Sequence, residues 1–367
     1  MLTRRNLLIG ASAIPLLAST ARFSAAADSL AEAALKAGEN ELVFAGGTGG
    51  YAAMVKKHFL DPFTEETGIK VVEAGGSYGE KLAKLKAMSQ VGQYEWDVVT
   101  LSADHLVAQN AQYLRDLGAE CGEVPNVAAN GVPGACLRYG VLFDIGGGVM
   151  AYSTEAFKDA GKAPSSWADF WDVKTFPGPR ALPNIGTPWW PMIAALLADG
   201  VPPDQLFPLD VDRAFAKLDE IKPHIAVWWK SGDQSQQIWR SGEVVMAQMY
   251  AGRALGLRKE GLPVGVSWNG APLDAAAWCV LKDAKRPLAA LALLNFLYTR
   301  PEAHAAFDVE SNGITAMRAA LAMLDPDSQK VQATAPDNWK GIVQIDRGWL
   351  GQNNAEVLEK WTSWVAS

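Results

Sequence analysis

The sequence predicts an α/β protein made of two lobes and a helical tail. Short apolar runs alternate with helical segments in two separate sets, a pattern typical of mainly parallel sheets flanked by helices. A polar loop rich in glycine and proline separates the two sets, and from Ala289 onward the strand signal is weak. The length of 367 residues is sufficient for roughly two domains.

In the first set, three apolar strands are each followed by a helix. We expect strands over 41–45, 69–74 and 96–101, and helices over 50–64, 79–90 and 103–110. The second set begins with the run "YGVLFDIGGGVMAYSTEAF", which Gly146 to Gly148 interrupt, and continues through "RALPNI", "HIAVWW", "EVVMAQMY" and "LPVGVSW". These runs predict the strands of a second sheet.

Residues 1–27 predict a signal peptide. They contain the pair Arg4 and Arg5, an apolar run from Leu7 to Leu17, and small residues that end at Ala27. The arginine pair indicates the twin-arginine export route. A membrane anchor is the alternative, but the apolar run is shorter than the ~20 residues that span a bilayer. We therefore expect a mature chain that starts near residue 28 and lies in the periplasm.

The chain is acidic and has no motif for a metal ion or for nucleotide hydrolysis. Its net charge is −7 at pH 7, and cleavage of segment 1–27, which contains arginines and no acid, would make it more negative. Such a surface repels nucleic acid and anionic lipid. The four histidines lack the spacing of metal ligands, and no phosphate-binding G-x-x-x-x-G-K-[ST] loop occurs. We expect neither a metal nor a cofactor.

Cys121 and Cys136 lie in the polar stretch "AECGEVPNVAANGVPGACLRYG". In an oxidising compartment this pair predicts a disulfide that closes a loop, with two free buried thiols as the alternative. Cys279 lies in the apolar run "AAAWCVL", which predicts a core position.

The glycine loop in "ELVFAGGTGGYAAM" allows two interpretations. Gly47, Gly49 and Ala52 fit the dinucleotide fingerprint G-x-G-x-x-G/A, and the acidic Glu73 closes the next strand. This pattern would suit a twin-arginine-exported NAD(P)-dependent oxidoreductase. However, no catalytic constellation of histidine, lysine and tyrosine follows at a recognisable spacing.

A second loop, in "VVEAGGSYGEKL", matches another catalytic pattern. Gly75, Ser77 and Gly79 fit the nucleophile elbow G-x-S-x-G of serine hydrolases. Only one mature strand precedes this loop, whereas such an elbow normally follows several strands. The position therefore disfavours a hydrolase.

The two glycine loops are better explained together. Both end consecutive strands, so both should lie at the carboxyl edge of one sheet, where open α/β proteins bind ligands. A tyrosine follows each loop. We expect Thr48, Tyr51, Ser77 and Tyr78 to contact a small polar solute, and we expect binding instead of catalysis.

The second set of strands adds aromatic and cationic residues at strand ends. Trp189, Trp229, Tyr250 and Arg253 each follow or end an apolar run. Aromatic walls suit a cationic or partly apolar ligand, through cation–π contacts of ~0.5–2 kcal/mol. For the tryptophans, packing within the core is the alternative.

Several stretches resemble the extracellular solute-binding proteins of ABC importers, in particular the spermidine/putrescine-binding branch. They include "SSWADFWDVKTFPGPRAL", "DVDRAFAKLDEIKPHIAVWWKSGDQSQQIWRSGEVVMAQMYAGRA" and "VSWNGAPLDAAAWCVLKDAK". The resemblance implies two lobes of periplasmic-binding-protein type II, joined by two crossings, that close over a solute by a hinge motion. It implies a monomer without enzymatic activity that delivers its solute to a membrane permease. Lobe 1 would comprise 28–142 plus 275–326, and lobe 2 would comprise 143–274 plus 327–367.

Departures from the family pattern bear on the ligand. The loop that supplies carboxylates in polyamine binders has Ile185 and Pro188 here, and a later pocket acid falls near Ala276, which leaves Asp274 as the nearest carboxylate. Arg253 could instead bind a carboxylate through its two-pronged guanidinium. We expect Arg253 and Asp274 to hold a small ω-amino acid such as 4-aminobutyrate, with a polyamine as the alternative ligand. The alternative role for Arg253 is an ion pair with a local acid.

Overall fold

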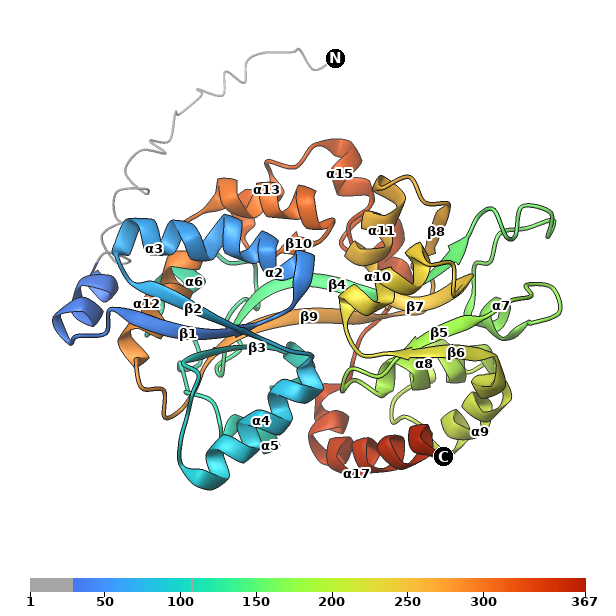
Figure 1. Ribbon diagram of the computed structural model, residues 1–367, viewed down its shortest axis with the longest axis horizontal. Helices are drawn as coiled ribbons and strands as arrows, with labels where there is room; N and C mark the ends of the chain where they lie inside the picture. Colours follow the sequence, from blue (N-terminus) through green and yellow to red (C-terminus); the bar gives the residue numbers. More distant parts are fainter. Residues whose placement is uncertain (1–28, 107) are drawn as a thin grey trace, which may run out of the picture.

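The computed structural model describes residues 29–106 and 108–367 (Figure 1). The predicted signal peptide, 1–27, lies outside the described residues. Within the described part of the chain, no helix is long and apolar enough to cross a membrane.

Lobe 1 is built on three parallel strands at one end of the molecule. They are β1 (Glu41–Gly46), β2 (Lys70–Gly75) and β3 (Val98–Ser102), close to the positions predicted. Helices α2 (Gly49–Val55) and α3 (Asp61–Thr67), joined by the π-helical turn Lys56–Leu60, cover one face of this sheet. Helix α4 (Tyr78–Val91) covers the opposite face (Figure 1).

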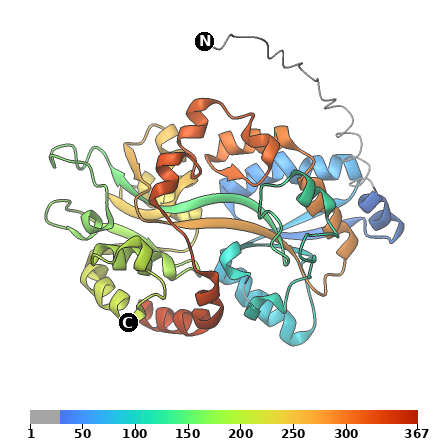
Figure 2. The ribbon, with the colours of Figure 1, turned by 180° about the vertical axis from the view of Figure 1, so that it is seen from behind.

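Two long strands run through both lobes. They are β4 (Val141–Ser153) and β9 (Ala271–Val280), which pair with each other in antiparallel orientation and cross the middle of the molecule (Figure 2). The strand order of the sheet is β2-β1-β3-β9-β4-β7-β5-β6. The outer pairs are therefore parallel, as predicted, whereas the crossing strands make antiparallel pairs. The lobe boundaries expected at 142/143 and 274/275 fall within these two strands.

Lobe 2 repeats the layered arrangement. Its strands are β5 (Arg180–Pro183), β6 (Ile225–Trp229), β7 (Met246–Tyr250) and β8 (Val264–Ser267). Its main helices are α7 (Trp167–Trp171), α8 (Trp189–Ala198), α9 (Val211–Ile221), α10 (Gly232–Arg240) and α11 (Ala251–Lys259). Helices α10 and α11 lie on one side of the sheet, and α8 and α9 lie on the other (Figure 1).

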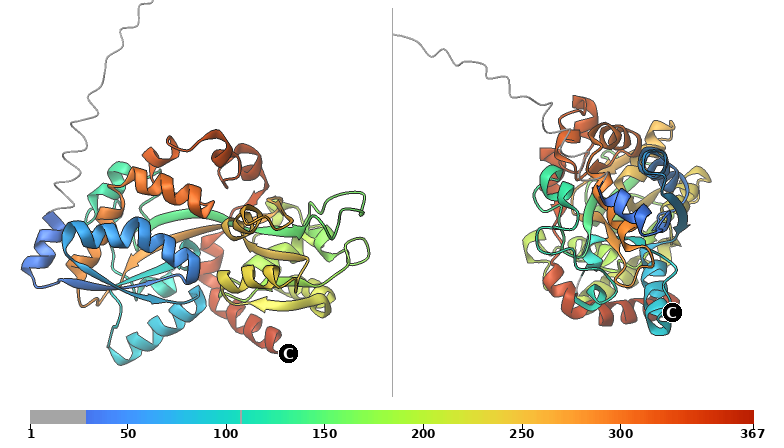
Figure 3. Two further views of the ribbon diagram at one scale, coloured as in Figure 1. Left: turned by 45° about the horizontal axis from the view of Figure 1, so that its top comes forward. Right: turned by 90° about the vertical axis from the view of Figure 1, so that its left-hand side faces the viewer.

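The C-terminal part of the chain is mostly helical, as predicted. Helices α12 (Pro287–Leu297) and α13 (Pro301–Ser311) return to lobe 1, where α13 packs beside α2 (Figure 3). The last helix, α17 (Arg347–Ala366), packs on lobe 2 through Trp361 and Trp364, which contact Trp228. The remaining short elements are α5 (Ala108–Ala111), α6 (Pro125–Asn130), α14 (Arg318–Leu321), α15 (Pro326–Lys330), α16 (Pro336–Gly341), β10 (Ile314–Thr315) and β11 (Ile342–Val343).

Each lobe has its own apolar core. The core of lobe 2 contains Trp189, Trp190 and Trp229, whose side chains are fully buried. In lobe 1, Cys121 and Cys136 form a disulfide that closes the loop before β4. Cys279 is a free thiol buried in β9. Separate cores allow the lobes to move as units about the strands that join them.

Candidate ligand-binding site

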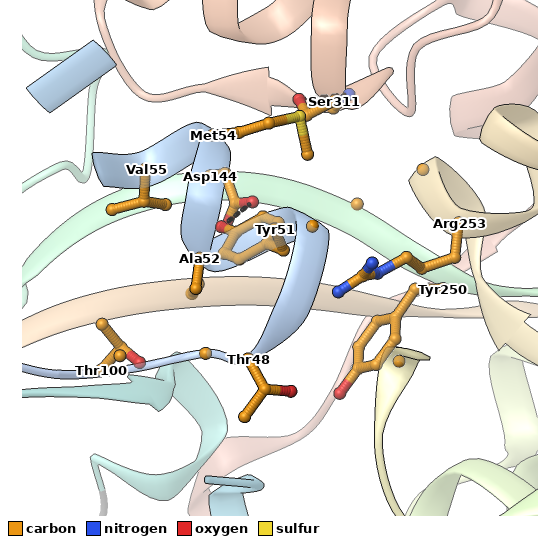
Figure 4. Close-up of a pocket in the computed structure, with 18 of the residues that line it drawn as sticks. Thr48, Tyr51, Ala52, Met54, Val55, Thr100, Asp144, Tyr250, Arg253 and Ser311 are labelled. Atoms are coloured by element: carbon orange, nitrogen blue, oxygen red, sulfur yellow. Dashed lines mark hydrogen bonds between the residues drawn. The ribbon is translucent and has the colours of Figure 1, made fainter. Parts of the chain in front are cut away.

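A cavity of about 470 Å³ lies between the lobes, at the carboxyl ends of the parallel strands. Its walls come from the loops after β1 and β2, from the crossing strands β4 and β9, and from helices α10 and α11 of lobe 2. Figure 4 shows side chains from both lobes that point toward this space. Of the nine residues expected to contact a ligand, seven line the cavity: Thr48, Tyr51, Ser77, Tyr78, Tyr250, Arg253 and Asp274.

The other two expected residues, Trp189 and Trp229, lie in the core of lobe 2 and outside the cavity lining. Both are fully buried. The indole nitrogen of Trp229 donates a hydrogen bond of 2.8 Å to the carbonyl oxygen of Gln248. Their position at strand ends, which suggested ligand contact, reflects packing between the sheet and its helices.

The loop after β1 meets a carboxylate of lobe 2. Thr48 Oγ1 donates a hydrogen bond of 2.9 Å to Asp233 Oδ2. Gly49 has a φ angle of +58°, and a Cβ atom added there would lie 2.2 Å from the Asp233 carboxylate. Glycine at position 49 is therefore required both by the backbone and by the close approach of Asp233.

The loop after β2 is closed by a helix cap. Ser77 Oγ accepts a hydrogen bond from the Glu80 backbone nitrogen, and the Glu80 carboxylate accepts from the Ser77 backbone nitrogen and hydroxyl. This capping box explains a serine at the start of α4 without any catalytic role. The match to the nucleophile elbow is accounted for by helix capping.

The lobes touch around the cavity. The backbone nitrogen of Gly79 donates a hydrogen bond of 3.2 Å to the carbonyl oxygen of Ile185 in lobe 2. His105 Nε2 lies 3.0 Å from the carbonyl oxygen of Gly186. A Cβ atom at Gly186 would approach the Cα atom of Gly79 to 2.8 Å, so small residues permit this contact. The structure is therefore a closed arrangement of the lobes.

Two half-buried carboxylates from the crossing strands lie at the cavity. Asp144 of β4 pairs with Ala276 of β9, and Asp274 of β9 pairs with Gly146 of β4, so the two acids lie near each other. Asp144 Oδ2 accepts a hydrogen bond of 2.7 Å from the hydroxyl of Tyr51. Asp274 Oδ1 is buried and has no hydrogen-bond partner among the described residues.

The environment of these acids disfavours negative charge. Burial raises the pKa of Asp144 to about 6. Burial, and then the negative charges of Asp144 and Asp104, raise the pKa of Asp274 well above its usual range. A cationic group placed in the cavity would reverse this effect, because it would stabilise the ionised carboxylates.

Three tyrosines line the cavity together with the two acids and Arg253. Burial raises the pKa of Tyr51, Tyr78 and Tyr250 well above the usual value, so all three hydroxyls stay protonated. The Cζ atom of Arg253 lies 5.9 Å from the centre of the Tyr51 ring. The cavity thus combines neutral hydroxyl donors with aromatic faces.

Arg253 lies in the first turn of α11 and borders the cavity from lobe 2 (Figure 4). Its Nη1 atom donates to Asp233 Oδ1 at 3.1 Å and to Gln236 Oε1 at 3.0 Å. A Cβ atom at Gly232 would lie 2.8 Å from Arg253 Nε, so glycine makes room for the guanidinium. The ion pair with a local acid, stated above as the alternative role, is present, and the side chain also lines the cavity.

The chain matches the family model of bacterial extracellular solute-binding proteins over residues 58–337, which is more than half of its length. It belongs to this family. The expected two-lobed α/β fold of a binding protein is confirmed.

Relatives of this solute-binding protein carry names that refer to small amines and amino acids. The gamma-aminobutyric acid-binding protein of Pseudomonas aeruginosa is 33% identical over 325 residues, which cover 87% of this chain and 89% of the relative. The spermidine/putrescine-binding periplasmic protein of Escherichia coli is 24% identical over 295 residues, covering 76% and 79%. An ABC transporter substrate-binding protein from Bradyrhizobium japonicum USDA 110 superposes with a TM-score of 0.76 at 33% identity, covering 88% of this chain and 99% of that structure.

The dinucleotide interpretation of the first glycine loop does not fit this solute-binding protein. The Asp233 carboxylate occupies the position next to Thr48 and Gly49, where a pyrophosphate would be repelled. Glu73, which would bind a ribose in that interpretation, instead forms an ion pair of 3.1 Å with Lys56. The glycine at position 49 is therefore explained by contact between the lobes.

Among the residues of the cavity wall that the sequence analysis did not name are Asp144 and Lys81. Asp144 lines the cavity and lies in an apolar run just before the glycines of β4. An acidic residue within an apolar run could have indicated a functional position. Lys81 of α4 is only 2% exposed, and its Nζ donates to the carbonyl oxygen of Gly46 at 3.0 Å and to Thr100 Oγ1 at 2.6 Å. Burial lowers the pKa of Lys81 to about 7. A lysine on a helix normally faces solvent, so no sequence signal marked it.

Proposed function

We propose that this protein captures a small ω-amino acid, such as 4-aminobutyrate, in the periplasm and delivers it to the permease of an ABC importer. Lobe closure would enclose the solute, and the closed protein would be the form that the permease recognises. The protein acts by binding and carries out no reaction. The predicted signal peptide supports the periplasmic location, and the acidic surface disfavours nucleic acid as a partner.

One observation carries the choice of ligand. A guanidinium from lobe 2 and two half-buried carboxylates from the crossing strands line the same cavity. Arg253 would bind the carboxylate of the solute, and Asp274 with Asp144 would bind its ammonium group. A zwitterion would place an opposite charge beside each of these groups. The name of the Pseudomonas aeruginosa relative supports the same ligand class.

A polyamine is the second candidate, because some relatives are named for spermidine and putrescine. A long dication needs carboxylates at separated positions, whereas here Asp144 and Asp274 lie together and Arg253 is a cation on the same cavity. The charge arrangement therefore favours the amino acid.

A binding panel tests the proposal. We expect 4-aminobutyrate to raise the midpoint of thermal unfolding, with a stabilisation of about 3 kcal/mol at 100 times the dissociation constant. Arg253→Ala and Asp274→Asn should each weaken binding at least 100-fold by calorimetry, because each leaves one charge of the buried zwitterion unpaired. Arg213→Ala, which removes a surface ion pair with Asp199, is the matched control and should bind normally. Stabilisation by putrescine or spermidine and by no amino acid would establish the alternative ligand.

A further inference from the structure

We propose that Asp233 is a positioning residue that latches the two lobes together and at the same time fixes the guanidinium of Arg253. This inference rests on the proposed function, because it assigns Arg253 to the solute. Asp233 contacts both Arg253 of lobe 2 and Thr48 of lobe 1. A solute that binds Arg253 is thereby linked to the contact between the lobes.

The two carboxylate oxygens of Asp233 serve different lobes. Oδ2 accepts from Thr48 Oγ1 of lobe 1 at 2.9 Å, and Oδ1 accepts from Arg253 Nη1 of lobe 2 at 3.1 Å. Thr48 belongs to lobe 1 and Asp233 to lobe 2, so separation of the lobes would break this contact. The contact between Asp233 and Arg253 lies within lobe 2 and does not need closure.

The local structure leaves Asp233 free for this role. It lies in the first turn of α10, where an acid often stabilises the exposed backbone nitrogens of a helix. Here Ser231 is the capping residue, and its Oγ accepts from the Gln234 backbone nitrogen at 3.2 Å. The Asp233 side chain instead contacts Thr48 of lobe 1 and Arg253 of α11.

Lobe 1 is shaped to receive this carboxylate. Gly49 adopts a φ angle of +58° and has no Cβ atom, which would come within 2.2 Å of Asp233. Thr48 precedes α2 with an extended backbone, and its side chain makes no cap for that helix. The hydroxyl is instead committed to Asp233. A threonine–glycine pair at this turn thus forms the receiving part of the latch.

The latch couples binding to closure. A solute can shift the open–closed equilibrium only through contacts that differ between the two states, and the contact between Thr48 and Asp233 exists only in the closed state. Loss of this contact should lower the closed population and reduce the apparent affinity for any enclosed solute. It should act mainly by raising the dissociation rate.

The test is a double-mutant cycle on Thr48 and Asp233, with 4-aminobutyrate and putrescine as probes. Thr48→Val removes the hydroxyl at constant shape, and we expect binding to weaken about tenfold, the scale of one hydrogen bond to a charged group. Asp233→Ala should weaken binding by at least as much. The double variant should be no weaker than Asp233→Ala alone, because both changes remove the same contact.

Two further variants separate a latch from a direct ligand contact or a folding defect. Thr48→Ser keeps the hydroxyl and should restore wild-type affinity and dissociation rate, measured by calorimetry and stopped-flow tryptophan fluorescence. Gly49→Ala should weaken binding because its Cβ atom blocks Asp233. The thermal midpoint of each ligand-free variant checks that it folds.

Additive losses in the cycle, or unchanged affinity in Thr48→Val, would overturn the latch. If the wild-type protein binds putrescine and not 4-aminobutyrate, the proposed ligand fails. The latch then still predicts weaker putrescine binding by Thr48→Val and non-additivity with Asp233→Ala. The two proposals can therefore fail separately.

Discussion

The hydroxyl of Tyr51 donates a hydrogen bond of 2.7 Å to Asp144 Oδ2, and so joins helix α2 of lobe 1 to the crossing strand β4. This bond gives the half-buried Asp144 carboxylate a donor at the cavity, and it lowers the pKa of Asp144 against the larger effect of burial. The amine end of the proposed site therefore depends on a residue that is not itself charged.

Replacing Tyr51 by phenylalanine should weaken 4-aminobutyrate binding about tenfold at pH 7. Without the donated hydrogen bond, the pKa of Asp144 rises further above about 6, and less of the carboxylate is ionised to hold an ammonium group. The deficit should shrink at pH 8.5, where Asp144 ionises again. Calorimetry across this pH range measures the effect. A deficit that does not change with pH would show that the hydroxyl acts directly on the ligand.

Asp144→Asn should stabilise the ligand-free protein at pH 7 while impairing binding. Because burial raises the folded-state pKa of Asp144 to about 6 from an ordinary value of 3.8, the native state binds more protons than the unfolded state between these values. The contribution of Asp144 to stability therefore falls as pH rises from about 4 to 6. We expect the variant to gain about 1–3 kcal/mol at pH 7.

The gain in Asp144→Asn should disappear below about pH 4, where the wild-type carboxyl is protonated in both states. Other buried groups titrate in the same pH range. Burial lowers the pKa of His105 to about 4, so its contribution to stability rises with pH while that of Asp144 falls. These contributions are the same in both proteins, so they cancel in the difference between the two free energies of unfolding, measured in urea. A variant less stable than the wild-type protein at pH 7 would contradict the prediction.

Lys81→Met should destabilise the protein, and more so at high pH. The change leaves the Gly46 carbonyl and the Thr100 hydroxyl without their buried donor, at a cost of about 1–3 kcal/mol. Burial lowers the folded-state pKa of Lys81 to about 7 from 10.5, so the unfolded state binds more protons between these values. Wild-type stability therefore rises with pH across that window.

Urea unfolding at pH 7 and pH 9 should show that the Lys81→Met variant lacks this rise. The exposed Lys86, on the same helix, offers a control, and Lys86→Met should follow the wild-type curve. If the free energy of unfolding depends on pH equally in Lys81→Met and in the wild-type protein, the titrating group is not Lys81.

Removing the disulfide with Cys121→Ser and Cys136→Ser should lower stability by about 3 kcal/mol, because the loop of 15 residues regains freedom in the unfolded state. Solute affinity should stay within about twofold, since neither cysteine lines the cavity. Thermal unfolding with and without reductant gives the measurement, and the double variant should be insensitive to reductant. A wild-type midpoint that reductant leaves unchanged would contradict this prediction.

Much of the fold was predictable because strand and helix periodicities are local. The strands before the glycine loops begin and end within a few residues of their expected positions. The antiparallel pairing of β4 with β9 was not predicted, because the two strands lie more than a hundred residues apart in the sequence. Their apolar runs could have paired with several partners.

The candidate site was predictable in part for the same reason. Tyr51 and Tyr78 follow strand ends, and the topology of parallel strands brings such positions to one edge. Trp189 and Trp229 follow strand ends too, but they fill the core of lobe 2. The type of a residue and its position at the end of a strand do not determine which way a large side chain points. That direction depends on how the neighbouring helices pack.

The residues alone predicted the alternation of strands and helices, and they carried the family resemblance that the comparison bears out. The reason for a glycine at position 49 became evident from the packing of the two lobes. Gly49 admits a carboxylate from α10 of the opposite lobe. Local sequence cannot encode the identity of that partner, because the contact forms only when two separately folded lobes close on each other.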